Sequence, residues 1–229
     1  MDSFLNNLLF GIYPYVAGTV FLFGSLVRFD MSQYTWKTNS SQIVDASPRF
    51  RLANNLFHIG VLFLLFGHFF GLLTPHSWEE AVGITPGFHQ ILAMTSGGIF
   101  GLCAVIGGAM LIHRRWTNPR VRAQSSQMDI PIIIILFIQL LLGLATIPVS
   151  AQHLNGSEML TLSAWAQHIV TFRPGAAAIV ADVSWIFKLH LFLGLTVFLL
   201  FPFTRLVHIW SAPIWYLGRR YQIVRMRGD

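Results

Sequence analysis

The chain has 229 residues, of which 54% are hydrophobic and only 10% are charged, and its mean hydropathy is +0.60. This composition excludes an ordinary soluble domain and is typical of a protein that crosses a membrane several times. The formal charge of +6 would suit a nucleic-acid partner, but the positions of the basic residues explain it differently, as described below.

The single cysteine, Cys103, lies in an apolar run. One cysteine excludes an internal disulfide, the attachment motif of a c-type haem and an iron–sulfur cluster bound by the chain's own thiolates. Any such cluster therefore belongs to a partner. The first residues lack the positive charge that opens a cleavable signal peptide, so we expect the first apolar segment to be retained.

Five apolar segments are long enough to cross a bilayer, which requires about 20 residues. They cover about 4–27, 52–73, 89–112, 130–150 and 183–210. The connections between them are too short for an independent core. The sequence therefore predicts an all-α, polytopic membrane protein, a bundle of five transmembrane helices forming one domain over residues 1–229, with a tail at 211–229.

Lysine and arginine gather on one side of the predicted bundle, as they do in cytoplasmic loops. Thirteen of the fifteen lie in the first connection, the third connection or the C-terminal end. They are Arg28, Lys37, Arg49, Arg51, Arg114, Arg115, Arg120, Arg122, Arg205, Arg219, Arg220, Arg225 and Arg227. We therefore expect the N-terminus outside and the C-terminus and its tail in the cytoplasm. The basic excess then needs no nucleic acid.

The third segment carries small residues at helical spacing, among them Gly97, Gly98, Gly101, Gly107 and Gly108. Small side chains let helices, or a flat cofactor, approach closely. We favour helix packing as their main role.

The nine histidines fall into two groups. Four lie within or near the ends of predicted spans with no charge cluster beside them: His58, His68, His190 and His208. The others lie at span ends or in outer loops, where solvation or a local hydrogen bond is the simpler interpretation: His76, His89, His113, His153 and His168. A histidine in hydrocarbon needs partners for two ring nitrogens, so the first group requires an explanation.

The second and fifth segments run in opposite directions, which would bring His58 opposite His208 and His68 opposite His190. Two cross-helix pairs at two depths are the arrangement that two bis-histidine b-type haems require. Ten residues rise about 15 Å and eighteen about 27 Å, so straight parallel helices cannot bring both pairs level. A tilt, or a bend at Pro202, would absorb part of the difference. On one continuous helix, eighteen residues are five turns and would place His190 and His208 on one face.

A single buried histidine is more often bonded to a backbone carbonyl, but four in two antiparallel spans favour iron ligation. Glycines that would leave room beside a porphyrin support this interpretation: Gly60, Gly67, Gly71 and Gly194. Arg205 precedes His208 by three residues and would reach a haem propionate.

Short motifs in the same order along nearly the whole chain resemble one family. They are Gln33-Tyr34-Thr35-Trp36, Asn55-Leu56-Phe57-His58-Ile59-Gly60, Gly67-His68-Phe69-Phe70-Gly71, Leu73-Thr74-Pro75-His76, Ile147-Pro148, Ser150-Ala151-Gln152-His153, Gly156-Ser157-Glu158-Met159, Leu189-His190-Leu191, Phe201-Pro202-Phe203 and Arg205-Leu206-Val207-His208-Ile209-Trp210-Ser211. The family is the gamma subunit of membrane-bound respiratory nitrate reductase, a five-helix dihaem cytochrome b.

The resemblance implies two haem b groups, one held by His58 and His208 on the cytoplasmic side and one by His68 and His190 on the outer side. It implies oxidation of a quinol, menaquinol or ubiquinol, from the quinone pool near the outer haem. Electrons would pass to an iron–sulfur beta subunit and then to a molybdenum-containing alpha subunit, both on the cytoplasmic side. The chain would thus be a subunit of a quinol:nitrate oxidoreductase in the cytoplasmic (inner) membrane of a prokaryote, without reducing nitrate itself.

The resemblance also places His68 and His89 at the quinol site. Where relatives are expected to carry a lysine, at the start of the third span, this chain has His89. A histidine there would bond a quinone oxygen and take up a proton near neutral pH.

Two alternatives stay open at this point. A related dihaem subunit could serve another terminal oxidoreductase, because membrane helices do not identify a partner's substrate. A proton-coupled transporter could use the histidines as a relay, although no inverted repeat and no mid-span carboxylate supports it.

Overall fold

A computed structural model describes residues 3–36, 47–152 and 154–211 of the chain. Within these ranges every regular element is helical, and five stretches are long and apolar enough to cross a membrane. They are Ser3–Thr35, Pro48–Leu73, Pro86–Thr117, Asp129–Ser150 and Trp185–Phe203. The five-span prediction is confirmed. The predicted tail, Lys37 and His153 lie outside the described residues.

The first span is not a uniform α-helix. It is built from α1 (Ser3–Asn7), α2 (Tyr13–Thr19) and α3 (Ser25–Ser32), joined by the π-helical turns Leu8–Ile12 and Val20–Gly24. Pro14 lies in the first turn of α2, directly after the wider π-helical turn. It has no backbone N–H to donate to that turn. The proline therefore changes the local winding without ending the span.

The second and third spans, α4 (Pro48–Leu73) and α6 (Pro86–Thr117), form the most extensive helix pair. Glycine makes this possible, because a Cβ atom at Gly60 would lie 2.5 Å from the Phe100 carbonyl oxygen. A Cβ at Gly107 would meet the backbone N–H of Phe57. Close helix packing is thus the role of the small residues at these positions, as predicted for the third span.

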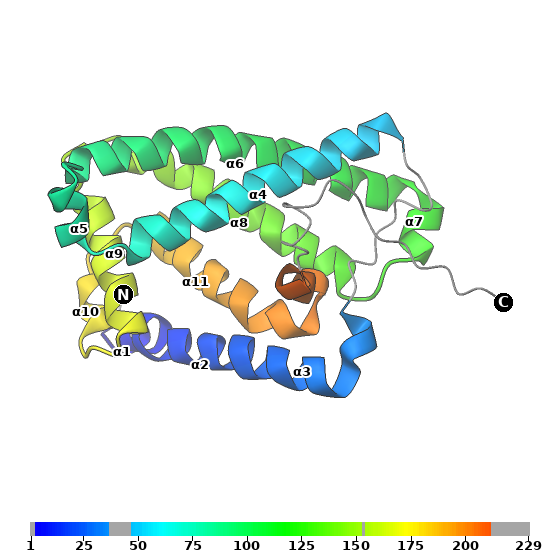
Figure 1. Cartoon of the computed structure of the whole chain (residues 1–229), viewed down its shortest axis with the longest axis horizontal. Coiled ribbons are helices and arrows are strands. Elements are labelled where there is room, and N and C mark those ends of the chain that lie inside the picture. Colours follow the sequence, from blue (N-terminus) through cyan, green and yellow to red (C-terminus); the bar gives the residue numbers. More distant parts are fainter. Residues whose placement is uncertain (1–2, 37–46, 153, 212–229) are drawn as a thin grey trace.

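The remaining spans, α8 (Asp129–Ser150) and α11 (Trp185–Leu200), complete the bundle. α8 packs against α6 and α11, and α11 packs against α8 and the first span (Figure 1). The partners of α4 are α6 and α9 (Ser157–Val170). α4 and α11, which carry His68 and His190, therefore do not pack tightly against each other.

The last span differs most from prediction. α11 ends at Leu200, a 3₁₀ turn covers Phe201–Phe203, and Thr204 is extended at φ −120° and ψ 178°. A second 3₁₀ helix, Arg205–Ser211, then lies beside the end of α11 instead of continuing its line (Figure 1). The prediction that His190 and His208 share one face of a continuous helix is wrong. Pro202, which cannot donate to the helix ladder, permits this break.

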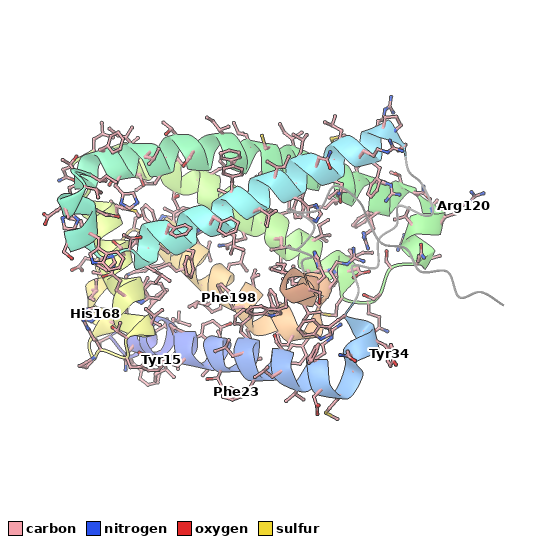
Figure 2. All side chains as sticks on the ribbon, in the orientation of Figure 1. Tyr15, Phe23, Tyr34, Arg120, His168 and Phe198 are labelled. Atoms are coloured by element: carbon pink, nitrogen blue, oxygen red, sulfur yellow. The ribbon has the colours of Figure 1, made fainter. Side chains whose placement is uncertain are left out.

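Short helices close both ends of the bundle. α5 (His76–Ala81), α9 and α10 (Ala176–Ile179) lie at one end, called the α5 end, and α7 (Pro119–Ala123) lies at the other, called the α7 end. Figure 2 marks the α5 end with His168 and Tyr15 and the α7 end with Arg120. At the α5 end the Trp165 indole donates to the Phe10 carbonyl at 3.0 Å, which ties α9 to the first span.

Candidate functional site

His68 of α4 and His190 of α11 face each other in the half of the bundle nearer the α5 end. Their ring centroids are 6.0 Å apart, with an interplanar angle of 39°. Nδ1 of His190 is buried and has no hydrogen-bond partner among the described residues. Two imidazoles at this separation are too far apart to bond each other directly, so the geometry suits a group between them.

An iron ion fits this separation. A metal–nitrogen bond of about 2.0–2.1 Å on each side, plus roughly 1.1 Å from each nitrogen to its ring centre, gives about 6 Å between centroids. Helix α8 packs directly against the His190 ring, because a Cβ at Gly143 would lie 3.1 Å from His190 Cε1. The Gln139 amide donates to the His190 carbonyl oxygen at 3.0 Å. Neither Gly143 nor Gln139 was identified from the sequence.

His58 of α4 and His208 of the segment Arg205–Ser211 form the second pair, toward the α7 end. Burial lowers the pKa of His208 below its ordinary value, and the nearby His58 ring acts in the same direction. Because its pKa is lowered, the His208 imidazole is neutral near pH 7. A neutral imidazole is the form that binds a metal.

Backbone hydrogen bonds select the nitrogen that is free for ligation. Nδ1 of His58, His68 and His208 contacts the carbonyl oxygens of Asn54, Leu64 and Arg205 at 2.8, 2.7 and 2.5 Å. Metal-bound histidines commonly donate their second N–H in this way, which fixes the tautomer and ring orientation. In all three residues Nε2 is then the nitrogen left for a ligand. The simple interpretation, a carbonyl-bonded histidine, and the ligand interpretation are thus compatible.

The glycines predicted to flank a porphyrin have different surroundings. Nothing lies within 4 Å of a Cβ built at Gly67, next to His68. Gly60 packs on α6, Gly71 adjoins His89 and Met159, and Gly194 adjoins the Gln139 amide. Only Gly67 therefore retains open space of the kind a flat ligand requires.

Arg205 was predicted to contact a haem propionate, and the structure shows a protein partner for it. Its guanidinium donates to both Asp129 carboxylate oxygens, at 2.8 Å each. Arg115 of α6 reaches the same carboxylate at 3.4 Å, and the Ser126 N–H donates to it at 2.9 Å. The Asp129 side chain is only 1% exposed. This network joins α6, α8 and the segment that carries His208. Its only trace in the sequence is one acidic residue at the start of an apolar run.

Arg28, at the end of the first span, holds the break before His208. Its Nη1 atom donates to the carbonyl oxygens of Pro202 and Thr204, at 2.7 Å each. These carbonyls lose their helical partners where the chain turns, so the arginine satisfies them. Arg28 was counted in the sequence only as a sign of cytoplasmic orientation.

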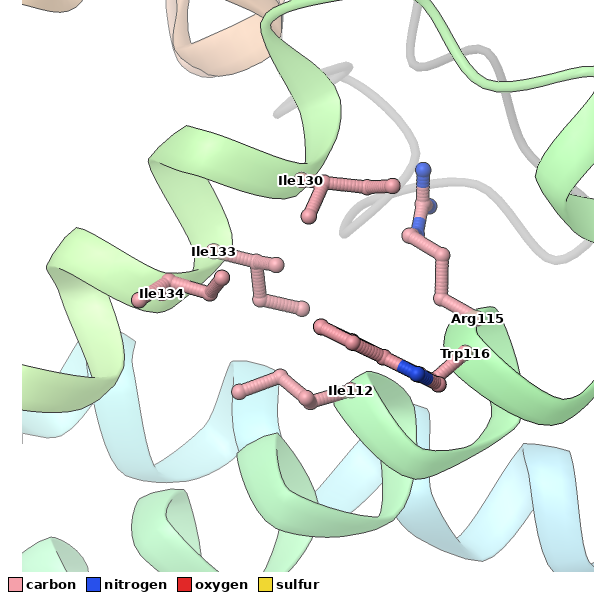
Figure 3. A pocket seen from close by; sticks show the side chains of 6 residues that line it. All are labelled: Ile112, Arg115, Trp116, Ile130, Ile133 and Ile134. Carbon is pink, nitrogen blue, oxygen red and sulfur yellow. The ribbon is translucent and has the colours of Figure 1, made fainter.

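Two pockets lie at the α7 end. One has a volume of about 600 Å³ and is lined by polar residues that include Arg28, Asp129 and Arg205. The other, of about 10 Å³, lies between α6 and α8 among isoleucines and Trp116 (Figure 3). The second holds no more than about one water molecule and is not a ligand site.

His89 lies at the α5 end, where α6 begins. Its Nδ1 atom contacts Glu79 Oε1 of α5 at 2.8 Å, and both side chains are largely buried. Its Nε2 atom would lie 3.3 Å from a Cβ at Gly71, which follows His68 on α4 by three residues. His89 therefore approaches α4 at Gly71, one helical turn from His68.

The fold and these residues together define a class: a polytopic membrane bundle with two cross-helix histidine pairs, one toward each end. The sequence profile of the nitrate reductase gamma subunit family matches residues 6–227. The chain belongs to this family.

Three relatives extend this result. The chain is 55% identical to the respiratory nitrate reductase 2 gamma chain of Escherichia coli K12, over 99% of this chain and 100% of the relative. It is 54% identical to the respiratory nitrate reductase 1 gamma chain of the same organism, over 98% and 99%. It is 34% identical to the nitrate reductase gamma chain of Bacillus subtilis, over 97% and 99%. The chain is thus a multi-pass subunit of an oxidoreductase complex of the bacterial inner membrane. It takes part in the electron transport of nitrate respiration.

Proposed function

We propose that the chain binds two haem b groups and carries electrons from a membrane quinol to the other subunits of a nitrate reductase complex. The observation that supports this most directly is the 6.0 Å separation of the His68 and His190 rings, together with a second histidine pair toward the opposite end of the bundle. His68 and His190 would hold the haem at the α5 end, and His58 and His208 the haem at the α7 end.

The bound haems would supply one-electron redox chemistry without making or breaking bonds to substrate. The protein supplies fixed ligands, and backbone carbonyls hold three of the four rings in the tautomer with Nε2 free. Arg205, beside His208 and already paired with Asp129, would add positive charge near the propionates at the α7 end.

The quinol site is proposed at the α5 end, between His68 and His89. Nδ1 of His89 contacts Glu79, and its Nε2 atom lies on the side of Gly71. A neutral His89 with its proton on Nδ1 would accept a proton from a quinol hydroxyl at Nε2. Histidine would in this way replace the lysine expected in relatives.

The direction of transfer follows from the basic residues. With the α7 end in the cytoplasm and the N-terminus outside, electrons would leave through the His58–His208 pair toward an iron–sulfur beta subunit and a molybdenum-containing alpha subunit. Moving one charge across the membrane potential is worth about 2.3 kcal/mol per 100 mV. Quinol oxidation at the outer face would thus conserve energy without a proton channel across the membrane.

A reduced-minus-oxidised spectrum of the purified complex, with haem counted per chain, tests the proposal. We expect b-type absorption from two haems in the wild type and from one haem in each variant His58→Ala, His68→Ala, His190→Ala and His208→Ala. The remaining haem should be the same species in the His58 and His208 variants and the other species in the His68 and His190 variants.

A histidine outside the two pairs provides the control: His168→Ala, a substitution of a partly exposed side chain of α9, should retain both haems. Absence of b-type absorption would contradict the proposal. Retention of both haems in His68→Ala would show that the pairing is wrong.

A further inference from the structure

Four ionisable side chains lie in a row at the α5 end. His89 Nδ1 contacts Glu79 Oε1 at 2.8 Å, Glu79 Oε2 lies 3.6 Å from His76 Nδ1, and His76 Nε2 lies 3.1 Å from Glu80 Oε1. His76, Glu79 and Glu80 share one face of α5, since they are three and four residues apart. The row was not foreseen, because the sequence indicated only a solvated role for His76.

The row leads from the interior to the surface. The side chains of His89 and Glu79 are 14% and 11% exposed, His76 is 35% exposed and Glu80 is 66% exposed. A carboxylate as buried as Glu79 is costly without polar partners, and its two partners are the histidines on either side. The inner end, His89 Nε2, faces Gly71, one turn beyond His68.

One link in the row is open. The 3.6 Å between Glu79 Oε2 and His76 Nδ1 is longer than a hydrogen bond, and this buried His76 nitrogen has no partner among the described residues. A side-chain movement of about 0.5 Å would bring the two atoms within hydrogen-bond distance. A buried polar atom without a partner is uncommon in a folded protein, and a catalytic role is one explanation for it.

We propose that His89, Glu79, His76 and Glu80 form a proton relay that carries quinol protons from the α5-end site to the outer solution. This inference rests on the proposed function. Oxidation of the quinol releases two electrons and two protons, and the electrons leave separately through the haems. For each proton, the quinol O–H bond breaks as an N–H bond forms at His89 Nε2.

The proton on His89 Nδ1 then passes to Glu79 Oε1, so His89 returns to its neutral state. Rotation of the protonated Glu79 carboxyl then brings this proton to His76 Nδ1, and the His76 Nε2 proton passes to Glu80 and from there to water. Glu79 ends as a carboxylate again. Each histidine now holds its proton on the opposite nitrogen, so both rings turn over before the second quinol proton follows the same route. Because histidine has two nitrogens on opposite sides of its ring, each histidine accepts on one side and donates on the other.

The test uses membranes that contain the complete complex, with menadiol as the quinol and haem reduction followed by stopped flow. We expect Glu79→Gln to lower the rate of haem reduction at least tenfold, since general acid–base catalysis contributes about 10²–10⁴-fold. Haem content should be unchanged, and the solvent deuterium isotope effect should increase. Asp182→Asn, which removes an exposed carboxylate from the loop before α11, is the control and should match the wild type.

His76→Ala gives a second and independent readout. We expect a several-fold slower reduction that millimolar imidazole restores, because a small base replaces the missing ring, whereas a merely structural role would not respond. If Glu79→Gln retains the wild-type rate and isotope effect, the relay is wrong. If Glu79→Gln does not assemble with haem, His76→Ala decides, and an unchanged rate there overturns the relay.

Failure of the proposed function is separable from failure of the relay. If the wild-type complex has no haem, or its haem is not reduced by menadiol, the quinol role itself is wrong. If the wild type is reduced and every relay variant matches Asp182→Asn, only the relay is wrong.

Discussion

The two histidine pairs are built by different means. His68 and His190 both lie inside regular helices, so their separation is set by helix position and by the small residue Gly143 behind them. His58 also lies inside α4, but its partner His208 follows a break in the chain and is held by polar contacts. A pair on two helices inherits the rigidity of the bundle, whereas the second pair depends on a few hydrogen bonds and one buried carboxylate. Substitutions at the polar contacts should therefore affect the His58–His208 pair and leave the His68–His190 pair unchanged.

The largest effect is expected from Asp129→Ala. The substitution removes the buried carboxylate that Arg205 and Arg115 both contact, and loss of one member of a buried ion pair costs about 3–5 kcal/mol. We expect the haem of the His58–His208 pair to be lost while that of the His68–His190 pair remains, as measured by the difference spectrum and haem content.

Asp30→Ala is the control for this experiment, because Asp30 is an exposed carboxylate near the same end of the bundle. It should retain both haems. Equal loss of both haems in Asp129→Ala would contradict the idea that the two pairs are independently supported.

Arg28→Gln should act on the same pair with a smaller effect. The variant loses the guanidinium that bonds the carbonyls of Pro202 and Thr204, and hydrogen bonds to charged groups contribute about 1.5–3 kcal/mol when well shielded. Arg28 is partly exposed, so we expect about 1–3 kcal/mol in total. A lower urea midpoint for release of the haem of the His58–His208 pair, with no change for the other haem, would be the measured result. A uniform shift of both haems would argue against a local role.

Gln139→Leu tests the pair held by helices. The substitution removes the amide that donates to the His190 carbonyl and leaves α8 and α11 otherwise intact. We expect a cost of about 1 kcal/mol and a change confined to the spectrum and redox midpoint of the haem of the His68–His190 pair. A change at the haem of the His58–His208 pair instead would contradict the assignment of Gln139 to the His68–His190 pair.

The smallest effect is expected from Gly143→Ala. Its new methyl group would lie 3.1 Å from His190 Cε1, so the ring must shift by about 0.3 Å. Both haems should be retained, with a slight change in the spectrum of the His68–His190 species. A variant that loses this haem altogether would show that the ring has less freedom than the helices suggest.

Part of the site was predictable because it is local. An apolar stretch with two histidines needs no tertiary information to be recognised as unusual, and the opposite directions of two helices were enough to suggest which histidines pair. The mismatch between spacings of ten and eighteen residues indicated a bend at Pro202. The extent of that bend was not predictable, because a proline permits either a kink or a complete break, and the surrounding contacts of Arg28 decide between them.

Other residues carried no local signal. Asp129 precedes an apolar run and Glu79 and Glu80 follow another, and nothing in the sequence singles them out. Their roles depend on partners from distant parts of the chain, Arg205 in one case and His89 in the other. His76 was similarly predicted to be solvated, and it gained two carboxylate neighbours only through the fold of α5.

By itself, the sequence determined the membrane class, the number of spans, the family and the four histidines that stand out within the apolar segments. These features follow from composition, hydrophobic length and side-chain chemistry, which act residue by residue. Only the tertiary structure decided where the last helix breaks, which carboxylate binds Arg205, and that His89 connects to the surface through Glu79 and His76. Those are contacts between segments far apart in the chain, and their distances are set by how the helices pack.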